Sequence, residues 1–178
     1  MAETANHQSR RYLTLTLGGG FFAIDIHVVR EILDYTDITR IPQTPGYMRG
    51  VVNVRGNAVP VMDLASKLGL GEVDRTINTR IVIVEIRQNG EVTLIGALAE
   101  AVKEVLELED TAIAPPPALG TAGDAACIQG IGRQDGRFIL LLDVAEVFGT
   151  AEVYDLAAAL ADRGPVVSDK QSAACVGE

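Results

Sequence analysis

The sequence predicts an all-β chain with a few short helices, arranged as two similar lobes. Three observations support this prediction. Short stretches of alternating apolar and polar residues recur along the chain, and this period of two is typical of half-buried strands. Hydrophobic residues make up 48% of the chain but aromatic residues only 4%, which favours a core of Val, Ile and Leu in pleated sheet. A block of residues in the first half also recurs in the second half.

The first predicted element is a β-hairpin. Residues 1–10 are expected to form a disordered leader, and strict alternation then begins over residues 12–17. The glycine run 18–20 joins this strand to a second one over residues 21–26, in the same phase. Residues 28–33 follow as a tight turn that leads into another strand.

A second hairpin is predicted after a segment broken by prolines. Residues 51–55 and 58–62 read as its strands, and Gly56-Asn57 is expected to turn the chain between them. A short helix should follow, because the Asp63 carboxylate can accept hydrogen bonds from the amides of a first helical turn.

A third hairpin is predicted over residues 80–98. Asn89-Gly90 lies at its centre, and this dipeptide suits a type I′ turn. Residues 104–109 alternate again as a strand, and the segment 115–126, rich in proline and small residues, is expected to be a loop.

The chain contains an internal repeat. Residues 50–69 align without a gap on residues 130–149, and 29–33 resemble 102–106. The identical positions are Gly50 and Gly130, Gly56 and Gly136, Asp63 and Asp143, Ala65 and Ala145, and Gly69 and Gly149. These are turn glycines, helix caps and helix stops, so the repeat predicts an internal duplication that gives two similar β-lobes.

The duplication places one two-lobed domain at residues 11–150. Residues 151–178 are expected to contain a short Ala-rich helix, over 155–163, and a flexible tail. The opening residues lack the apolar segment of a secretion signal, so a cytoplasmic location is expected. Cys127 and Cys175 are then expected to be free thiols.

The charge of the chain argues against two classes of partner. Lys and Arg number 15 against 24 Asp and Glu, a formal net charge of −9. Nucleic-acid affinity comes mainly from cationic side chains that displace counterions, so no nucleic-acid partner is expected. The apolar runs are strand-length, far short of the roughly 20 residues that a helical membrane span needs, so no membrane insertion is expected.

No catalytic, metal or cofactor site is predicted. The histidines and cysteines are scattered without metal-ligand spacing, and His27 is expected to pack at a strand end. The glycine run 18–20 joins two strands and is not followed by Gly-Lys-Ser/Thr, so it is not a phosphate loop. The carboxylates Glu104, Glu107 and Glu109 read as a solvated strand edge.

Two features are candidates for contacts with other proteins. Arg55 sits beside a turn, and its counterpart in the repeat is Asp135, so the fold itself does not require an arginine there. It is either a contact residue or a solvent-facing hairpin tip. Residues 28–33 mix apolar and charged side chains, which suits a contact surface, although a core turn with a solvated rim explains them as well.

Several stretches of the chain resemble the CheW family of chemotaxis coupling proteins. They are residues 24–26, 29–32, 39–45, 50–64, 78–84, 102–106 and 130–143. The most specific runs from Asn53 to Leu64 and has the form N-x-R-G-x-x-x-P-x-x-D-L. The resemblance covers about residues 11–150 and implies two five-stranded SH3-like β-barrels, in agreement with the duplication.

The resemblance also implies a non-enzymatic function and two partners. CheW-like proteins hold a CheA-type histidine kinase, through its regulatory domain, against the cytoplasmic helical hairpin tips of chemoreceptors. The positions that match receptor-binding residues are Val29, Arg55, Val102 and Val105. The positions that match kinase-binding residues are Glu31, Ile32 and Arg49. No cofactor is implied.

Two alternatives stay open. One is a small β-barrel enzyme or ligand-binding domain, which would need a deep polar cleft between the lobes with converging titratable side chains. The other is a CheW-like coupling protein of a non-motility chemosensory pathway, such as surface sensing.

Overall fold

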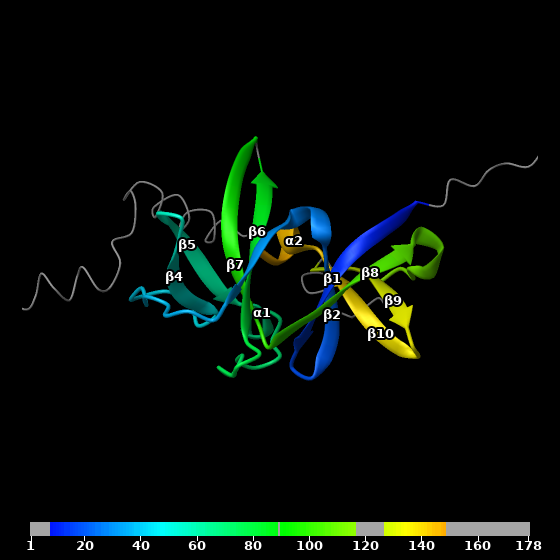
Figure 1. Ribbon diagram of the computed structural model, residues 1–178, viewed down its shortest axis with the longest axis horizontal. Coiled ribbons are helices and arrows are strands. Elements are labelled where there is room, and N and C mark those ends of the chain that lie inside the picture. The colour runs from blue at the N-terminus through cyan, green and yellow to red at the C-terminus, as the bar shows by residue number, and fades with distance from the viewer. Residues whose placement is uncertain (1–7, 89, 117–126, 149–178) are drawn as a thin grey trace, which may run out of the picture.

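The computed structural model describes residues 8–88, 90–116 and 127–148. Two five-stranded, mostly antiparallel sheets form two SH3-like barrels that lie side by side (Figure 1). Lobe 1 is the sheet with strand order β3-β6-β7-β5-β4, and lobe 2 is the sheet β8-β1-β2-β10-β9. The predicted all-β class is therefore confirmed.

The elements follow one another as strands with short helices between them. In chain order they are β1 (Ser9–Leu17), β2 (Gly20–Asp25), the 3-10 helix η1 (Ile26–Val28), β3 (Val29–Asp34), β4 (Met48–Val54), β5 (Asn57–Asp63), α1 (Leu64–Lys67), β6 (Arg80–Gln88), β7 (Glu91–Ala99), β8 (Ala101–Glu109), the 3-10 helix η2 (Asp110–Ala112), β9 (Ile128–Gln134), β10 (Arg137–Leu142) and α2 (Val144–Phe148). Strand β1 begins at Ser9, inside the predicted leader, because Ser9 pairs with Glu109 of β8. Asn89 and the predicted tail helix lie outside the described residues.

The pairing of the strands confirms the duplication. Each repeat contributes a hairpin, a third strand, a second hairpin and a helix. In both lobes the second hairpin joins the sheet through a parallel pair, β5 with β7 and β10 with β2. Equivalent positions are paired in the two second hairpins. Val52 pairs with Val59 in lobe 1, and the corresponding residues Gly132 and Ile139 pair in lobe 2.

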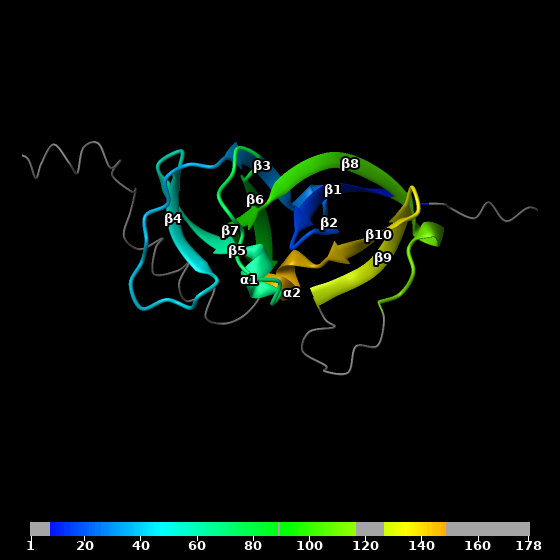
Figure 2. The same cartoon turned by 90° about the horizontal axis from the view of Figure 1, so that it is seen from below.

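The two repeats exchange their first hairpins. The hairpin β1–β2 of the first repeat lies in lobe 2, whereas β3, β4 and β5 lie in lobe 1. The second repeat does the reverse, with β6–β7 in lobe 1 and β8, β9 and β10 in lobe 2. Figure 2 shows β3 and β8, the strands at which the chain changes lobe, along one side of the molecule, with α1 and α2 on the other. Each lobe is therefore built from both halves of the sequence.

The main hydrophobic core is shared between the lobes. Its cluster includes Leu15 of lobe 2, Ile81 of lobe 1 and Phe148 of α2, all fully buried. A smaller cluster, with Tyr12 and Leu141, fills lobe 2 alone. Strand β1 thus buries both of its faces, so the half-buried strand that its alternation predicted is wrong for this element.

The predicted helix caps are confirmed. Asp63 accepts a hydrogen bond from the Ser66 amide at 3.0 Å, and Gly69 follows α1 with a φ of 75°. Asp143 caps α2 in the same way, accepting from the Ala145 amide at 3.1 Å. Gly149, the expected stop of α2, lies outside the described residues. Over the described ranges no helix is long and apolar enough to cross a membrane.

Candidate protein-interaction site

Residues 28–33, one of the two predicted contact surfaces, comprise the end of η1 and most of β3. Asp25 caps η1 by accepting from the His27 amide at 2.9 Å, which orients the chain as it enters β3. Val29 and Leu33 pack against the shared core. Ile32 points outward and is 42% exposed. Val29 and Leu33 fit the explanation of a core turn, and with Ile32 exposed the contact surface stays a prediction.

Arg55 occupies the tip of the β4–β5 hairpin. The turn residues are Arg55 and Gly56, with φ values of 52° and 87°, so the predicted turn at Gly56-Asn57 is wrong by one residue. A type I′ turn needs a positive φ at both central positions, and Asn57 already belongs to β5. The Asn53 side chain supports the turn by accepting from the Gly56 amide at 2.8 Å.

The arginine at this tip contacts a residue that was predicted for a different surface. Its side chain is 84% exposed, and its Nη2 lies 3.2 Å from Oε2 of Glu31 on β3. The resemblance assigned Arg55 to the receptor and Glu31 to the kinase, and the structure brings the two together. An ion pair this exposed contributes little to stability, so it is available to re-form with a partner.

Arg49 is held inside the protein. Its Nη2 and Nε donate to Oδ2 of Asp63 at 2.7 and 3.2 Å, and its Nη2 also donates to the Val73 carbonyl oxygen at 3.2 Å. The Asp63 side chain is fully buried and that of Arg49 is 26% exposed. This geometry gives Arg49 a structural role in lobe 1, and its contact with the kinase stays a prediction.

Val102 and Val105 lie on β8, the strand of lobe 2 that corresponds to β3. Val102 packs against the shared core, whereas Val105 is 49% exposed. Val102 also borders a pocket on lobe 2 that includes Glu104 and Asp135, the counterparts of Glu31 and Arg55. The ion pair of lobe 1 is therefore replaced by two carboxylates in lobe 2.

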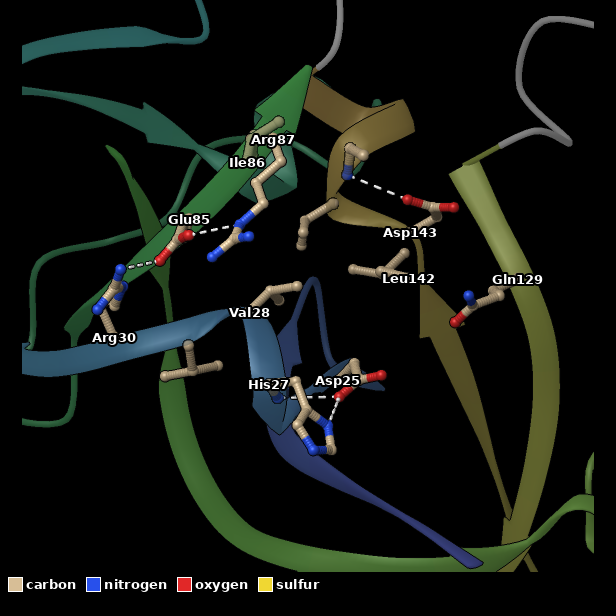
Figure 3. A pocket seen from close by; sticks show the side chains of 13 residues that line it. Asp25, His27, Val28, Arg30, Glu85, Ile86, Arg87, Gln129, Leu142 and Asp143 are labelled. Atoms are coloured by element: carbon tan, nitrogen blue, oxygen red, sulfur yellow. Dashed lines mark hydrogen bonds and ion pairs between the residues drawn. The ribbon is translucent and has the colours of Figure 1, made fainter. Parts of the chain in front are cut away.

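A polar pocket of about 760 Å³ lies between the lobes. The interlobe pocket, as we call it, is bordered by η1 and the start of β3, the end of β6, the start of β9 and the β10–α2 junction (Figure 3). Val29 is the predicted site residue that borders it. One wall carries Arg30 and Arg87, both bound to Glu85, and the other carries Asp25 and Asp143.

Two carboxylates of the interlobe pocket, Glu85 and Asp25, are paired with basic or imidazole side chains. The hydrogen bond from Arg87 lowers the pKa of Glu85 below its ordinary value, and Arg30 acts in the same direction, so Glu85 stays ionised instead of serving as a general acid. Asp25 accepts from His27 in a carboxylate–imidazole pair at 2.9 Å. No serine, threonine or cysteine borders the described walls, so this pair has no nucleophile to activate.

No group of three or more His, Cys, Asp or Glu is placed to hold a metal ion within residues 8–88, 90–116 and 127–148. Sequence reasoning missed the interlobe pocket, because its walls come from segments far apart in the chain. It also missed the Arg49–Asp63 pair. Continuing the repeat alignment by one residue, to Arg49 and Gln129, would have shown that lobe 2 lacks this arginine.

Two fused SH3-like barrels place the chain among two-barrel β-proteins. Residues 11–152 match the CheW-like domain, and the chain belongs to the CheW family. The family resemblance found in the sequence is thereby confirmed.

Similar proteins extend over most of the chain. The chemotaxis protein CheW of Klebsiella aerogenes is 31% identical over 144 residues, which covers 81% of this chain and 84% of the relative. Protein PilI of Pseudomonas aeruginosa is 33% identical over 78 residues, 44% of each chain. The crystal structure of the scaffolding protein TtCheW from Thermoanaerobacter tengcongensis superposes with a TM-score of 0.72 at 31% identity, covering 82% of this chain and 96% of that one.

Proposed function

We propose that this protein is a non-enzymatic, cytoplasmic adaptor that couples the hairpin tips of chemoreceptors to a CheA-type histidine kinase. The observation that carries the proposal is the CheW-like domain over residues 11–152, with its N-x-R-G motif at an exposed hairpin tip. A scaffold with separate faces can bind each partner modestly, because assembly multiplies weak contacts through effective concentration.

The receptor contact is assigned to Val29, Arg55, Val102 and Val105. A helical segment that docks on a groove does so through its apolar side chains. The valines of β3 and β8 offer apolar surface, and the planar guanidinium of Arg55 suits a carboxylate or carbonyl partner. Its high exposure leaves it free to exchange Glu31 for such a partner.

Reversing the charge of Arg55 is expected to weaken receptor binding selectively. Arg55→Glu should reduce co-sedimentation with receptor-containing membranes by about tenfold, because one anchor is lost and a carboxylate is introduced. The thermal midpoint and the affinity for the kinase should change little, since the side chain lies at a solvent-exposed turn. The charge-swapped double variant, with Glu31→Arg added, restores the ion pair and serves as the control. Recovery of receptor binding in that double variant would show that the pair, and not the arginine itself, matters.

The kinase contact is assigned to Glu31, Ile32 and Arg49. Ile32 is an exposed apolar side chain on the edge strand β3, with charged neighbours, which is the pattern of an apolar anchor with a polar rim. Arg49 is bound to Asp63, so it would contribute mainly by shaping this face.

Placing a charge at the centre of this face should disrupt kinase binding. Ile32→Asp is expected to lower the affinity for the kinase regulatory domain by about tenfold or more, measured by calorimetry with purified proteins. Val92→Asp, at a strand residue that is 53% exposed, is the matched control and should bind normally. Equal loss in both variants, or in neither, would argue against this face.

A second candidate is a coupling protein of a chemosensory pathway with an output other than motility. The similarity to Protein PilI, whose name is not that of a chemotaxis protein, supports this candidate, although it covers 44% of the chain. Deletion of the gene separates the two, because loss of swimming chemotaxis favours the first and an unchanged swimming response favours the second.

A further inference from the structure

The two repeats have the same strand pairing and the same register shift next to their helix-capping aspartates, Asp63 and Asp143. Met48 pairs with Met62 in lobe 1, and Ile128 pairs with Leu142 in lobe 2, at matching positions of the repeat. Both ladders shift register directly after this pair. The extra residue is Arg49 in one lobe and Gln129 in the other, and each lies beside the capping aspartate of its own lobe.

In lobe 1 the capping aspartate, Asp63, binds the guanidinium of Arg49. Oδ1 of Asp63 accepts from the Ser66 amide at 3.0 Å and caps α1. Oδ2 accepts from Arg49 at 2.7 and 3.2 Å and from the Val73 amide at 2.8 Å. One oxygen of the carboxylate therefore serves the helix and the other binds the cation.

In lobe 2 no described residue binds the corresponding oxygen of the aspartate. Oδ1 of Asp143 accepts from the amides of Ala145 and Glu146 at 3.1 and 3.3 Å, as expected for a cap. Within the described part of the chain, Oδ2 of Asp143 receives no hydrogen bond and no basic side chain pairs with this aspartate. Asp143 is partly exposed and borders the interlobe pocket, beside Gln129 (Figure 3).

We propose that the interlobe pocket is a binding site for the guanidinium of an arginine from a partner polypeptide. Oδ2 of Asp143 accepts hydrogen bonds from this guanidinium, as Oδ2 of Asp63 does from Arg49. Gln129 occupies the position in lobe 2 that Arg49 occupies in lobe 1. Asp25, on the same wall, uses Oδ1 for His27 and adds a second negative charge. The site does not depend on the proposed coupling function.

The charges of the other wall are compatible with this ligand. Arg30 and Arg87 would repel a third cation if they were unpaired. Both are bound to Glu85, whose side chain is 9% exposed and whose carboxylate stays ionised. The opposite wall carries Asp25, which is paired with His27, and Asp143, with which no basic side chain of the described residues pairs. A guanidinium fits better than an ammonium, because two of its planar donors can reach a single carboxylate oxygen, as Nη2 and Nε of Arg49 do at Oδ2 of Asp63.

The first experiment uses a blocked arginine as the probe. N-acetyl-L-arginine methylamide, titrated to millimolar concentrations into the ¹⁵N-labelled full chain, should shift the amides of Gln129, Asp143 and Ala145 saturably. The citrulline analogue, which has the same shape without the charge, should not. Asp143→Asn keeps a capping oxygen and should lose the shifts, while Asp135→Asn in the lobe 2 hairpin tip should retain them. Absence of shifts in the wild-type protein, or their persistence in Asp143→Asn, overturns the proposal.

The second experiment introduces an arginine of the protein itself into the proposed site. Gln129→Arg places a guanidinium at the position of Arg49 in the repeat, so it should occupy Oδ2 of Asp143 and abolish binding of the probe. It should also raise the thermal midpoint by about 2 °C, whereas Gln129→Met should not. An unchanged or lower midpoint together with normal probe binding would show that the new side chain and the probe do not share a site at Asp143, which overturns the proposal.

Discussion

Replacing Asp63 by alanine is expected to lower the free energy of unfolding by about 3–5 kcal/mol, the range for breaking one side of a buried ion pair. The side chain is fully buried and accepts from Arg49, Ser66 and Val73. Its removal leaves two amides without their acceptor and takes from the largely buried guanidinium of Arg49 its carboxylate partner, so that the Val73 carbonyl oxygen and the exposed Glu72 remain. Urea unfolding followed by circular dichroism measures the difference.

The duplication provides a matched control for this variant. Asp143→Ala removes the equivalent cap in lobe 2, where no basic side chain among the described residues pairs with the carboxylate. Its expected cost is about 1 kcal/mol, the usual value for a lost N-cap. If both alanine variants lose the same amount, the Arg49 pair contributes nothing beyond the cap.

Gly50→Ala is expected to lower the free energy of unfolding by about 4 kcal/mol. Gly50 has a φ of 139°, and a Cβ placed there would lie 2.1 Å from the backbone oxygen of Thr39. Thr39 exchanges two backbone hydrogen bonds with Val51, at 2.8 and 2.9 Å, so the segment cannot move away without losing them. Chemical denaturation compares this variant with the parent protein.

Gly56→Ala is the control that separates the cost of a positive φ from the cost of a steric clash in Gly50→Ala. Gly56 also has a positive φ, of 87°, but a Cβ there would meet no atom within 4 Å. Its substitution should cost about 1 kcal/mol, from conformational strain alone. A loss at Gly56 as large as that at Gly50 would contradict the role assigned to the contact with Thr39.

The sequence was most informative at positions where the local backbone conformation restricts the residue type. The duplication could be recognised because glycine marks turns and aspartate marks helix starts at the same spacing in both repeats. Asp63 and Asp143 are both caps in the structure, as predicted. The candidate sites depended on the family resemblance, since alternation alone left both Arg55 and residues 28–33 open to two explanations.

Contacts between distant segments could not be predicted in this way. Glu31 lies on β3 and Arg55 at the tip of β4–β5, at opposite edges of the lobe 1 strand order, and they meet because the sheet closes on itself. The turn was misplaced by one residue because arginine seldom adopts a positive φ. The exchange of hairpins between repeats also left no local signal, because each hairpin pairs internally in the same way whichever lobe it joins.

That exchange has a consequence for how the chain can fold as it leaves the ribosome. Strand β1 can pair with β8 only after residue 109 has been translated, because Leu15 pairs with Val102. Strand β2 stays unpaired on its outer edge until β10 has been made, because Phe22 pairs with Leu140. Lobe 1 gains its central β6–β7 hairpin earlier, which makes it the first part of the molecule that can close. Neither half of the domain contains all the strands of one barrel, so the outer edge of the first hairpin is covered only when the last strands have been made.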